Sequence, residues 1–292
     1  MVIADRLGFV VLLGLGLSCG VGFAVFDIRP LDANIFWTAA QSAHYYGTTW
    51  GADAGSFYVY PPPLAQLLGL IPWLVFVVVW MTLLFVGFWF ATRWWGLPVL
   101  GGGVGAGILL GHPHIFANPI LLTLVGNPQV LLAAAIVVGF RWPAAWALVL
   151  LTKIAPGIGL LWFAVRGEWR SLGIALGATA LIAGVSFVLA PGAWGDWLRF
   201  AVANAGTPSP QPVVQVPFAL RIATSAALIV WGARTNRRWT VPIAAGWSAI
   251  ALYEASYVTM WVAGLVLLNW RAPVHRSWTG ARAHRPAADA VK

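Results

Sequence analysis

Residues 73–92 read WLVFVVVWMTLLFVGFWFAT, a run of 20 residues without a charged side chain. The hydrocarbon core of a bilayer is about 30 Å thick, and an α-helix needs about 20 residues to cross it. Pro72 stands directly before the run, and proline ends or kinks a helix that would continue through it. The stretch therefore predicts a membrane-spanning helix that begins after Pro72.

The composition extends this prediction to the rest of the chain. Of its 292 residues, 60% are hydrophobic and only 9% are charged, whereas a soluble domain carries about 25% charged residues. The net charge is +9, but the basic residues stand in short clusters between apolar runs. This is the positive-inside pattern of membrane proteins and not a nucleic-acid-binding face. The single cysteine, Cys19, can form no disulfide within the chain.

The remaining apolar runs divide the chain into further membrane segments. The first run ends in no clear small-residue cleavage site, so we expect a retained span and not a removed signal peptide. The apolar runs occupy about 7–26, 61–92, 97–111, 118–140, 142–165, 171–190, 213–232 and 239–270. The basic positions between and after them are Arg93, Arg141, Arg166, Arg170, Arg234, Arg237, Arg238 and the tail from Arg271.

Two of these runs are interrupted by polar residues. A lysine at mid-bilayer costs about 3 kcal/mol, and proline disfavours a continuous helix, so TKIAP at 152–156 predicts two short legs with Lys153 at the turn between them. YEASY at 253–257 interrupts the last run in the same way. We expect about 8–10 transmembrane helices in one domain, residues 1–270, with both termini in the cytoplasm. Ten helices with short legs is the favoured count, and eight straight spans is the alternative.

With these basic clusters in the cytoplasm, most of the remaining ionisable residues are expected at the outer face. They are Asp27, Arg29, Asp32, Asp53, Lys153, Asp196, Arg199, Arg221 and Glu254. Ionisable groups at membrane depth are candidates for function, and a solvated outer loop is the plain alternative. The basic tail, residues 271–292, is expected to be disordered and cytoplasmic, where its arginines would meet anionic lipid headgroups.

The first outer loop, residues 27–60, has a pattern of its own. Residues 33–46 can form an amphipathic helix at the interface, with Phe36, Trp37 and Tyr45 as anchors. Because proline suits the first turn of a helix, a short helix is expected to begin at Pro62.

A carboxylate at such a surface suits sugar transfer from a lipid phosphate. One general base would deprotonate the acceptor hydroxyl, and cations would stabilise the departing phosphate. Glycoside hydrolysis would instead need two carboxylates with separate roles.

Four segments in order carry a resemblance to a known family. LDANIFWTAAQSAHYYG (31–47), FYVYPPPLAQLLGLIP (57–72), GNPQVLLAAAIVVGF (126–140) and WALVLLTKIAPGIGLLWFAVRGEWR (146–170) resemble the polyprenol-phosphate-mannose-dependent mannosyltransferases of glycosyltransferase family 87. The resemblance covers about residues 20–200. It implies a GT-C-like bundle with an outer-face catalytic loop in the plasma membrane. It further implies a hexosyltransferase, with mannose as the sugar, a polyprenyl-phosphate donor and a lipid or glycan acceptor.

The resemblance also implies roles for individual residues. Asp32 would be the catalytic base, with Asp27 as its rival. Tyr60 would shape the site together with its two following prolines, and Tyr58 joins it as a substrate-binding candidate. Lys153 would contact the phosphate. Arg29, Arg199 and Arg221 are phosphate candidates from their charge and side alone, and Glu254 is a further substrate-binding candidate. No cofactor and no metal is implied.

The chain departs from the family pattern in three places. Late in the family a Ser-Trp/Tyr-His-like element is common, whereas YEASYVTMW at 253–261 has Glu254 and Tyr257 but no histidine. The family has Gly-Gln-x-Asn where this chain has Gly126-Asn127-Pro128-Gln129, so Asn127 and Gln129 can be read as a helix cap only. The chain is also short for the family. A lipid or solute transporter, with Lys153 and Glu254 as coupling residues, and an inactive homologue are the alternatives.

Two further motifs have a plain interpretation. His112 and His114 have the spacing of metal ligands, but no third ligand is evident. GGGVGAG at 101–107 lies within an apolar run, so we expect it to allow close helix packing and not to bind a dinucleotide.

Overall fold

A computed structural model of the chain describes residues 2–42, 44–46, 58–109, 118–203, 216–249 and 258–268. Every regular element in these ranges is a helix, and the described residues contain no strand. The all-α class expected from the composition is therefore confirmed. Asp53, His112, His114, Glu254 and the tail 271–292 lie outside the described residues.

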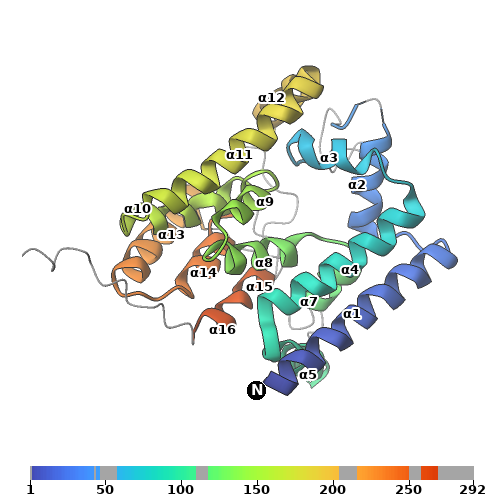
Figure 1. Cartoon of the computed structure of the whole chain (residues 1–292), viewed down its shortest axis with the longest axis horizontal. Coiled ribbons are helices and arrows are strands. Elements are labelled where there is room, and N and C mark those ends of the chain that lie inside the picture. Colours follow the sequence, from blue (N-terminus) through green and yellow to red (C-terminus); the bar gives the residue numbers. More distant parts are fainter. Residues whose placement is uncertain are drawn as a thin grey trace, which may run out of the picture.

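The described helices fall into two consecutive groups along the chain (Figure 1). The first group comprises α1 (Val2–Val25), α2 (Leu31–Gln41), α3 (Pro62–Leu68), α4 (Trp73–Thr92), η1 (Arg93–Trp95), α5 (Gly96–Leu109), α7 (Asn118–Leu124) and α8 (Gln129–Gly139). The second comprises η2 (Pro143–Ala145), α9 (Trp146–Leu150), η3 (Ala155–Leu160), α10 (Leu161–Val165), α11 (Trp169–Leu189), α12 (Pro191–Ala203), α13 (Phe218–Arg234), α14 (Thr240–Trp247), α15 (Val258–Trp261) and α16 (Ala263–Leu268).

Three helical segments of the described chain are long and apolar enough to cross a membrane. They are Ile3–Val25, Trp73–Val99 and Trp169–Leu189, with mean hydropathies of 2.2, 2.5 and 2.2. The second of them contains the run that begins after Pro72, and α4 starts at Trp73 as expected. These helices support a membrane protein, and the larger number of spans stays a prediction.

Helices α1 and α4 run side by side and pack closely (Figure 1). A Cβ atom added at Gly16 would lie 2.9 Å from Cα of Thr82, and one at Gly20 would lie 2.7 Å from Cα of Val78. Only glycine lets the two backbones approach this closely, which is the small-residue packing typical of membrane helices. The first apolar run is thus a packed part of the bundle.

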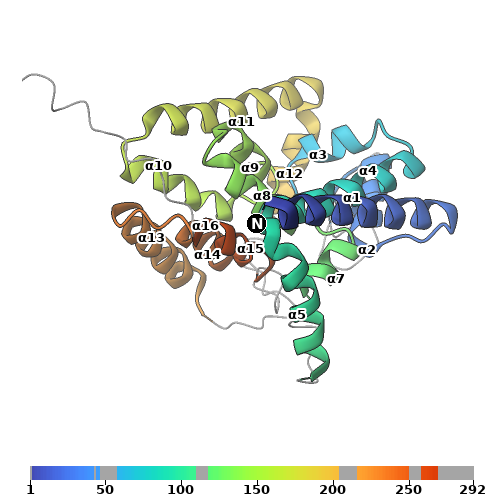
Figure 2. The ribbon, with the colours of Figure 1, turned by 60° about the horizontal axis from the view of Figure 1, so that its bottom comes forward.

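Three of the α5 glycines, in contrast, do not pack closely, so the expectation of close packing is wrong at these positions. A Cβ atom added at Gly101, Gly102 or Gly105 would meet nothing within 4 Å. Figure 2 shows why, because α5 projects away from the other helices.

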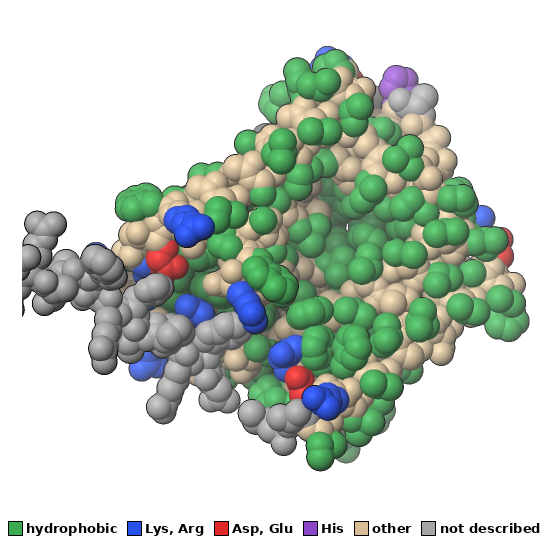
Figure 3. All heavy atoms as spheres, in the orientation of Figure 1, with side chains coloured by type: hydrophobic (Ala, Val, Ile, Leu, Met, Phe, Trp, Pro, Cys, Tyr) green, Lys and Arg blue, Asp and Glu red, His purple; other side chains and the backbone are tan. Residues whose placement is uncertain are grey.

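Most of the arginines lie toward one end of the bundle, separated from Asp27 and Asp32. Lys and Arg side chains gather along one edge of the face in Figure 3, beside a broad hydrophobic surface. At that end, Arg93 after α4 approaches Asp5 of α1, with 3.8 Å between Nη2 and Oδ2. Asp27 and Asp32 follow the other end of α1. This separation fits the positive-inside pattern, although the structure contains no membrane.

Residues 142–165 form the hairpin that the sequence predicts. Residues 151–154 are a turn between α9 and η3, and Lys153 lies in it. The two legs run antiparallel, because the rings of Trp146 and Phe163 lie 6.3 Å apart and a Cβ at Gly159 would touch Trp146.

Two expectations for the first loop need correction and one is confirmed. The helix ends at Gln41 and not at residue 46, because Ser42 is extended. Phe36 is only 4% exposed and belongs to the core, so it is no interfacial anchor. Helix α3 does begin at Pro62, in its first-turn position.

Candidate functional site

Asp32 is held at the N-terminus of α2 by the loop between α7 and α8. The backbone N–H groups of Asp32 and Ala33 both donate to the Val125 carbonyl, at 2.8 and 3.3 Å. These N–H groups have no partner within the helix, and Pro30 at the N-cap offers no side-chain acceptor. The loop carbonyl therefore caps α2 and fixes the backbone that carries the carboxylate.

The same loop needs a glycine at its centre. Gly126 has φ of +87°, a conformation that side chains disfavour. A Cβ there would also lie 2.5 Å from the Ala33 Cβ. Its carbonyl accepts a 2.8 Å hydrogen bond from Nε1 of Trp80 on α4, so the loop is tied to the long helix as well.

Asn127 joins the candidate site, although the sequence indicates only a helix cap at this position. Its Nδ2 donates to Oδ2 of Asp32 at 2.7 Å, and its Oδ1 accepts the backbone N–H of Gln129 at 3.0 Å. The expected helix cap of α8 is thus present, but the same amide also orients the Asp32 carboxylate. The position of Asn127 before a proline and an apolar run indicates that it caps α8. Nothing in the neighbouring sequence indicates that it also contacts Asp32.

Lys153 approaches this carboxylate from the tip of the α9–η3 hairpin. Its Nζ lies 6.0 Å from the centre of the Tyr60 ring. Burial lowers the pKa of Lys153 to about 8, and the charge of Asp32 opposes that shift. Burial raises the pKa of Asp32, while the hydrogen bond from Asn127 and the charge of Lys153 lower it. A carboxylate and an ammonium group therefore lie near enough to interact electrostatically in a partly desolvated place.

The tyrosines of the Tyr-Pro-Pro segment form the wall beside these charges. Tyr60 is 4% exposed, its ring lies 5.3 Å from that of Phe36, and its carbonyl accepts a 2.8 Å hydrogen bond from the Tyr46 hydroxyl. The Tyr58 hydroxyl accepts the Ala65 N–H at 2.9 Å and donates to the Pro61 carbonyl at 3.2 Å. Tyr58 is fully buried and caps α3, so its hydroxyl has a structural use.

Helix α12 packs over the outer side of this segment. Nε1 of Trp197 donates to the Val59 carbonyl at 3.3 Å, and the Phe200 ring stacks on Tyr46 with 5.7 Å between centres. Arg199 on the same helix is 77% exposed at its side chain and pairs with Asp196. The site thus combines α2, the segment before α3, the α7–α8 loop, the α9–η3 tip and α12.

Asp27 occupies a different environment from Asp32. Its carboxylate is 71% exposed and lies 3.2 Å from Nε of Arg29. The Arg29 guanidinium lies over the rings of Trp73 and Trp37, at 5.1 and 6.0 Å from their centres. The two candidate bases are therefore separated by their surroundings, and Arg29 belongs with Asp27.

Arg221 is 5% exposed and is used within the fold. Its guanidinium donates to the Val216 carbonyl before α13 and to the carbonyl groups of Trp247 and Ala249, where α14 ends. A cation at a helix C-terminus stabilises the exposed carbonyl groups there. Its proposed contact with phosphate stays a prediction, as does that of Arg199.

No three His, Cys, Asp or Glu side chains of the described residues come together to hold a metal ion. The chain matches no protein-family model, no curated protein and no solved structure.

Proposed function

We propose that the chain is a membrane hexosyltransferase that moves a sugar, mannose in the first instance, from a polyprenyl phosphate to an acceptor hydroxyl. The observation that carries the proposal is the Asp32 carboxylate, oriented by Asn127 at 2.7 Å and coupled electrostatically to Lys153. A base and a cation side by side are what this transfer needs.

The reaction requires one proton acceptor and one anion stabiliser. Asp32 takes the proton of the acceptor hydroxyl while the hydroxyl oxygen forms a bond to the anomeric carbon of the sugar. The bond between that carbon and the phosphate oxygen breaks, and the electron pair leaves with the polyprenyl phosphate. The leaving group needs no proton, because the positive charge of Lys153 balances the charge that it gains.

Asp32 is preferred over Asp27 as the base. The oxygen Oδ2 of Asp32 accepts a directed hydrogen bond, and burial raises the pKa of its carboxyl group toward the range useful for proton transfer. Asp27 is exposed and paired with Arg29. Lys153 interacts by charge with Asp32 and lies over the Tyr60 ring, which fits the roles implied by the resemblance to glycosyltransferase family 87.

The wider expectations belong to the same proposal. They are a GT-C-like bundle of about 8–10 spans, a plasma-membrane location, cytoplasmic termini and a site at the outer face. The three membrane-length helices support the membrane location. Asp32 follows the C-terminal end of α1, whereas Arg93 pairs with Asp5 at the N-terminal end of that helix, which supports placement of the site on the outer side.

The test is sugar transfer in membranes that contain the chain. Radiolabelled polyprenyl-phosphate mannose would be supplied with acceptor extracts to wild type, Asp32→Asn and Asp27→Asn at matched expression. We expect labelled product from wild type and Asp27→Asn, and a loss of about 10²–10⁴-fold in Asp32→Asn. Loss in Asp27→Asn alone would move the base. No product from wild type with several lipid-linked hexoses would contradict the proposal and direct the work to transport assays.

A further inference from the structure

Six arginines meet where α8, α10 and α13 end, at the pole of the bundle away from Asp32. They are Arg141, Arg166, Arg170, Arg234, Arg237 and Arg238. The only described acid among them is Glu168, so six positive charges face one negative charge and leave a surplus of five. We call these six residues the arginine cluster.

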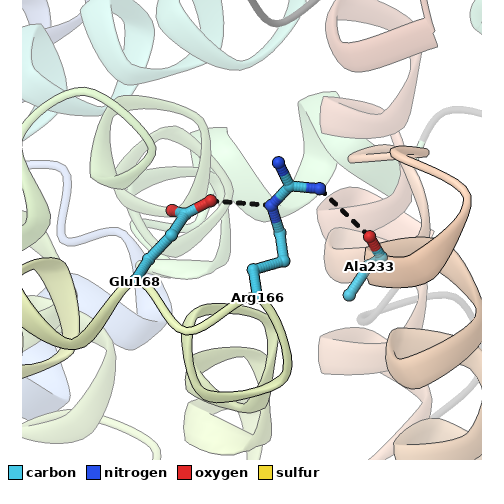
Figure 4. Close-up of polar contacts among 3 residues, drawn as sticks. All are labelled: Arg166, Glu168 and Ala233. Atoms are coloured by element: carbon cyan, nitrogen blue, oxygen red, sulfur yellow. Dashed lines mark hydrogen bonds and ion pairs between the residues drawn. The ribbon is translucent and has the colours of Figure 1, made fainter. Parts of the chain in front are cut away.

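Arg166 links the end of α10 to the end of α13. Its Nε donates to Oε1 of Glu168 at 2.7 Å, and its Nη1 donates to the Ala233 carbonyl in the last turn of α13 at 3.1 Å (Figure 4). The one acid of the cluster is therefore already paired. Arg141 and Arg237 are exposed, and no described carboxylate forms an ion pair with either.

Four guanidinium groups of the cluster lie over aromatic rings. The ring centres are 5.5 Å away for Arg141 over Trp142, 5.5 Å for Arg166 over Trp162, 5.3 Å for Arg237 over Trp231 and 4.9 Å for Arg238 over Phe140. A guanidinium group on a ring uses its flat face for that contact. The N–H donors at its edge keep the forked geometry that fits phosphate oxygens.

Exposed tryptophans surround the same arginines. Trp142, Trp169 and Trp231 are 61%, 66% and 45% exposed. Tryptophan prefers the depth of lipid headgroups, where its ring lies in an apolar layer and its N–H reaches water. Charge and ring exposure therefore indicate the same environment independently.

From these contacts we infer that the arginine cluster binds the phosphate headgroup of an anionic phospholipid in the adjoining leaflet. The positive-inside rule requires basic residues on this side, but it does not depend on how their side chains are arranged. It does not account for guanidinium groups that are stacked on rings from three helix ends and surrounded by exposed tryptophans. The inference does not depend on the proposed sugar transfer.

The test measures lipid binding by the full chain purified in detergent. Native mass spectrometry would follow titration with phosphatidylglycerol, with phosphatidylcholine as the neutral comparison. Each arginine near an anionic surface contributes about 1 kcal/mol, or about fivefold in affinity. We expect Arg141→Gln and Arg237→Gln each to weaken phosphatidylglycerol binding about fivefold, and the double variant about 25-fold.

Two comparisons separate a site from general attraction. The double variant Arg141→Lys/Arg237→Lys keeps the charge and the topology signal but loses the forked donors, so its binding should lie between wild type and the double Gln variant. Arg6→Gln removes a charge from α1 outside the cluster and should leave binding unchanged. An equal loss in Arg6→Gln, no loss in the double Gln variant, or displacement of the lipid by millimolar inorganic phosphate would overturn the inference.

Discussion

Asn127 donates a 2.7 Å hydrogen bond from its side-chain amide to the carboxylate of Asp32, 95 residues earlier in the chain. The other end of the amide caps α8 through the Gln129 N–H. One side chain therefore fixes both the start of a central helix and the direction of the candidate base.

Replacing Asn127 should change the pH dependence of transfer. Asn127→Asp keeps an acceptor for the Gln129 N–H but loses the donor to Asp32 and adds a negative charge beside it. The hydrogen bond lowers the pKa of Asp32, so its loss should raise that pKa and move the acid limb of the pH–rate profile to higher pH. Asn127→Ser should move the limb in the same direction by less. An unchanged acid limb in both variants would show that the bond does not act on the base.

The wild-type profile should itself be bell-shaped. Activity should rise as Asp32 ionises and fall as Lys153 loses its proton, since the pKa of Lys153 lies at about 8. Lys153→Arg should extend activity above that pH, because arginine stays charged. Lys153→Met should lose activity at every pH. Rates would be measured in membranes between pH 5 and 10, and an alkaline limb that persists in Lys153→Arg would exclude Lys153 as its source.

Gly126→Ala should destabilise the fold. Its positive φ and the close Ala33 side chain together predict a cost of about 1–3 kcal/mol. Gly101→Ala is the matched control, because a Cβ there meets nothing within 4 Å. That change should be neutral or stabilising by up to about 1 kcal/mol. Thermal unfolding in detergent compares the two, and equal midpoints would contradict the prediction.

Tyr58→Phe should lower the stability of the fold and leave the affinity for the donor substrate unchanged. The lost hydroxyl caps α3 through Ala65, so the expected cost is about 1–2 kcal/mol. Tyr46→Phe serves as the comparison for both the unfolding midpoint and the KM, because it loses the hydrogen bond to the Tyr60 carbonyl at the edge of the site. A raised KM for the donor in Tyr58→Phe, with the unfolding midpoint unchanged, would assign Tyr58 to substrate binding instead.

The local features of the fold were predictable from the sequence. Proline placed the starts of α3 at Pro62 and α4 at Trp73, because each helix begins where a proline excludes an earlier start. The charge of Lys153 within an apolar run predicted the turn between α9 and η3. These signals depend on one residue and its neighbours.

The contacts between distant segments were not predictable in this way. Hydropathy cannot tell which glycines of an apolar helix face a partner helix. Close packing was therefore expected at residues 101–107, whereas the structure has it at Gly16 and Gly20. Phe36 fits an interfacial anchor by type, yet Tyr58 and Tyr60 surround it. The Asp32–Asn127 bond joins two loops and leaves no pattern in either.

The cap that Val125 provides to α2 also sets an order in time. A ribosome adds about 5–20 residues per second, so about 5–20 s of synthesis separate Asp32 from the segment that holds it. Until α7 and α8 emerge, the carboxylate has neither its backbone anchor nor Asn127. Because the site also includes Lys153 and α12, which ends at Ala203, the nascent chain completes its candidate site only after about two thirds of its 292 residues have been made.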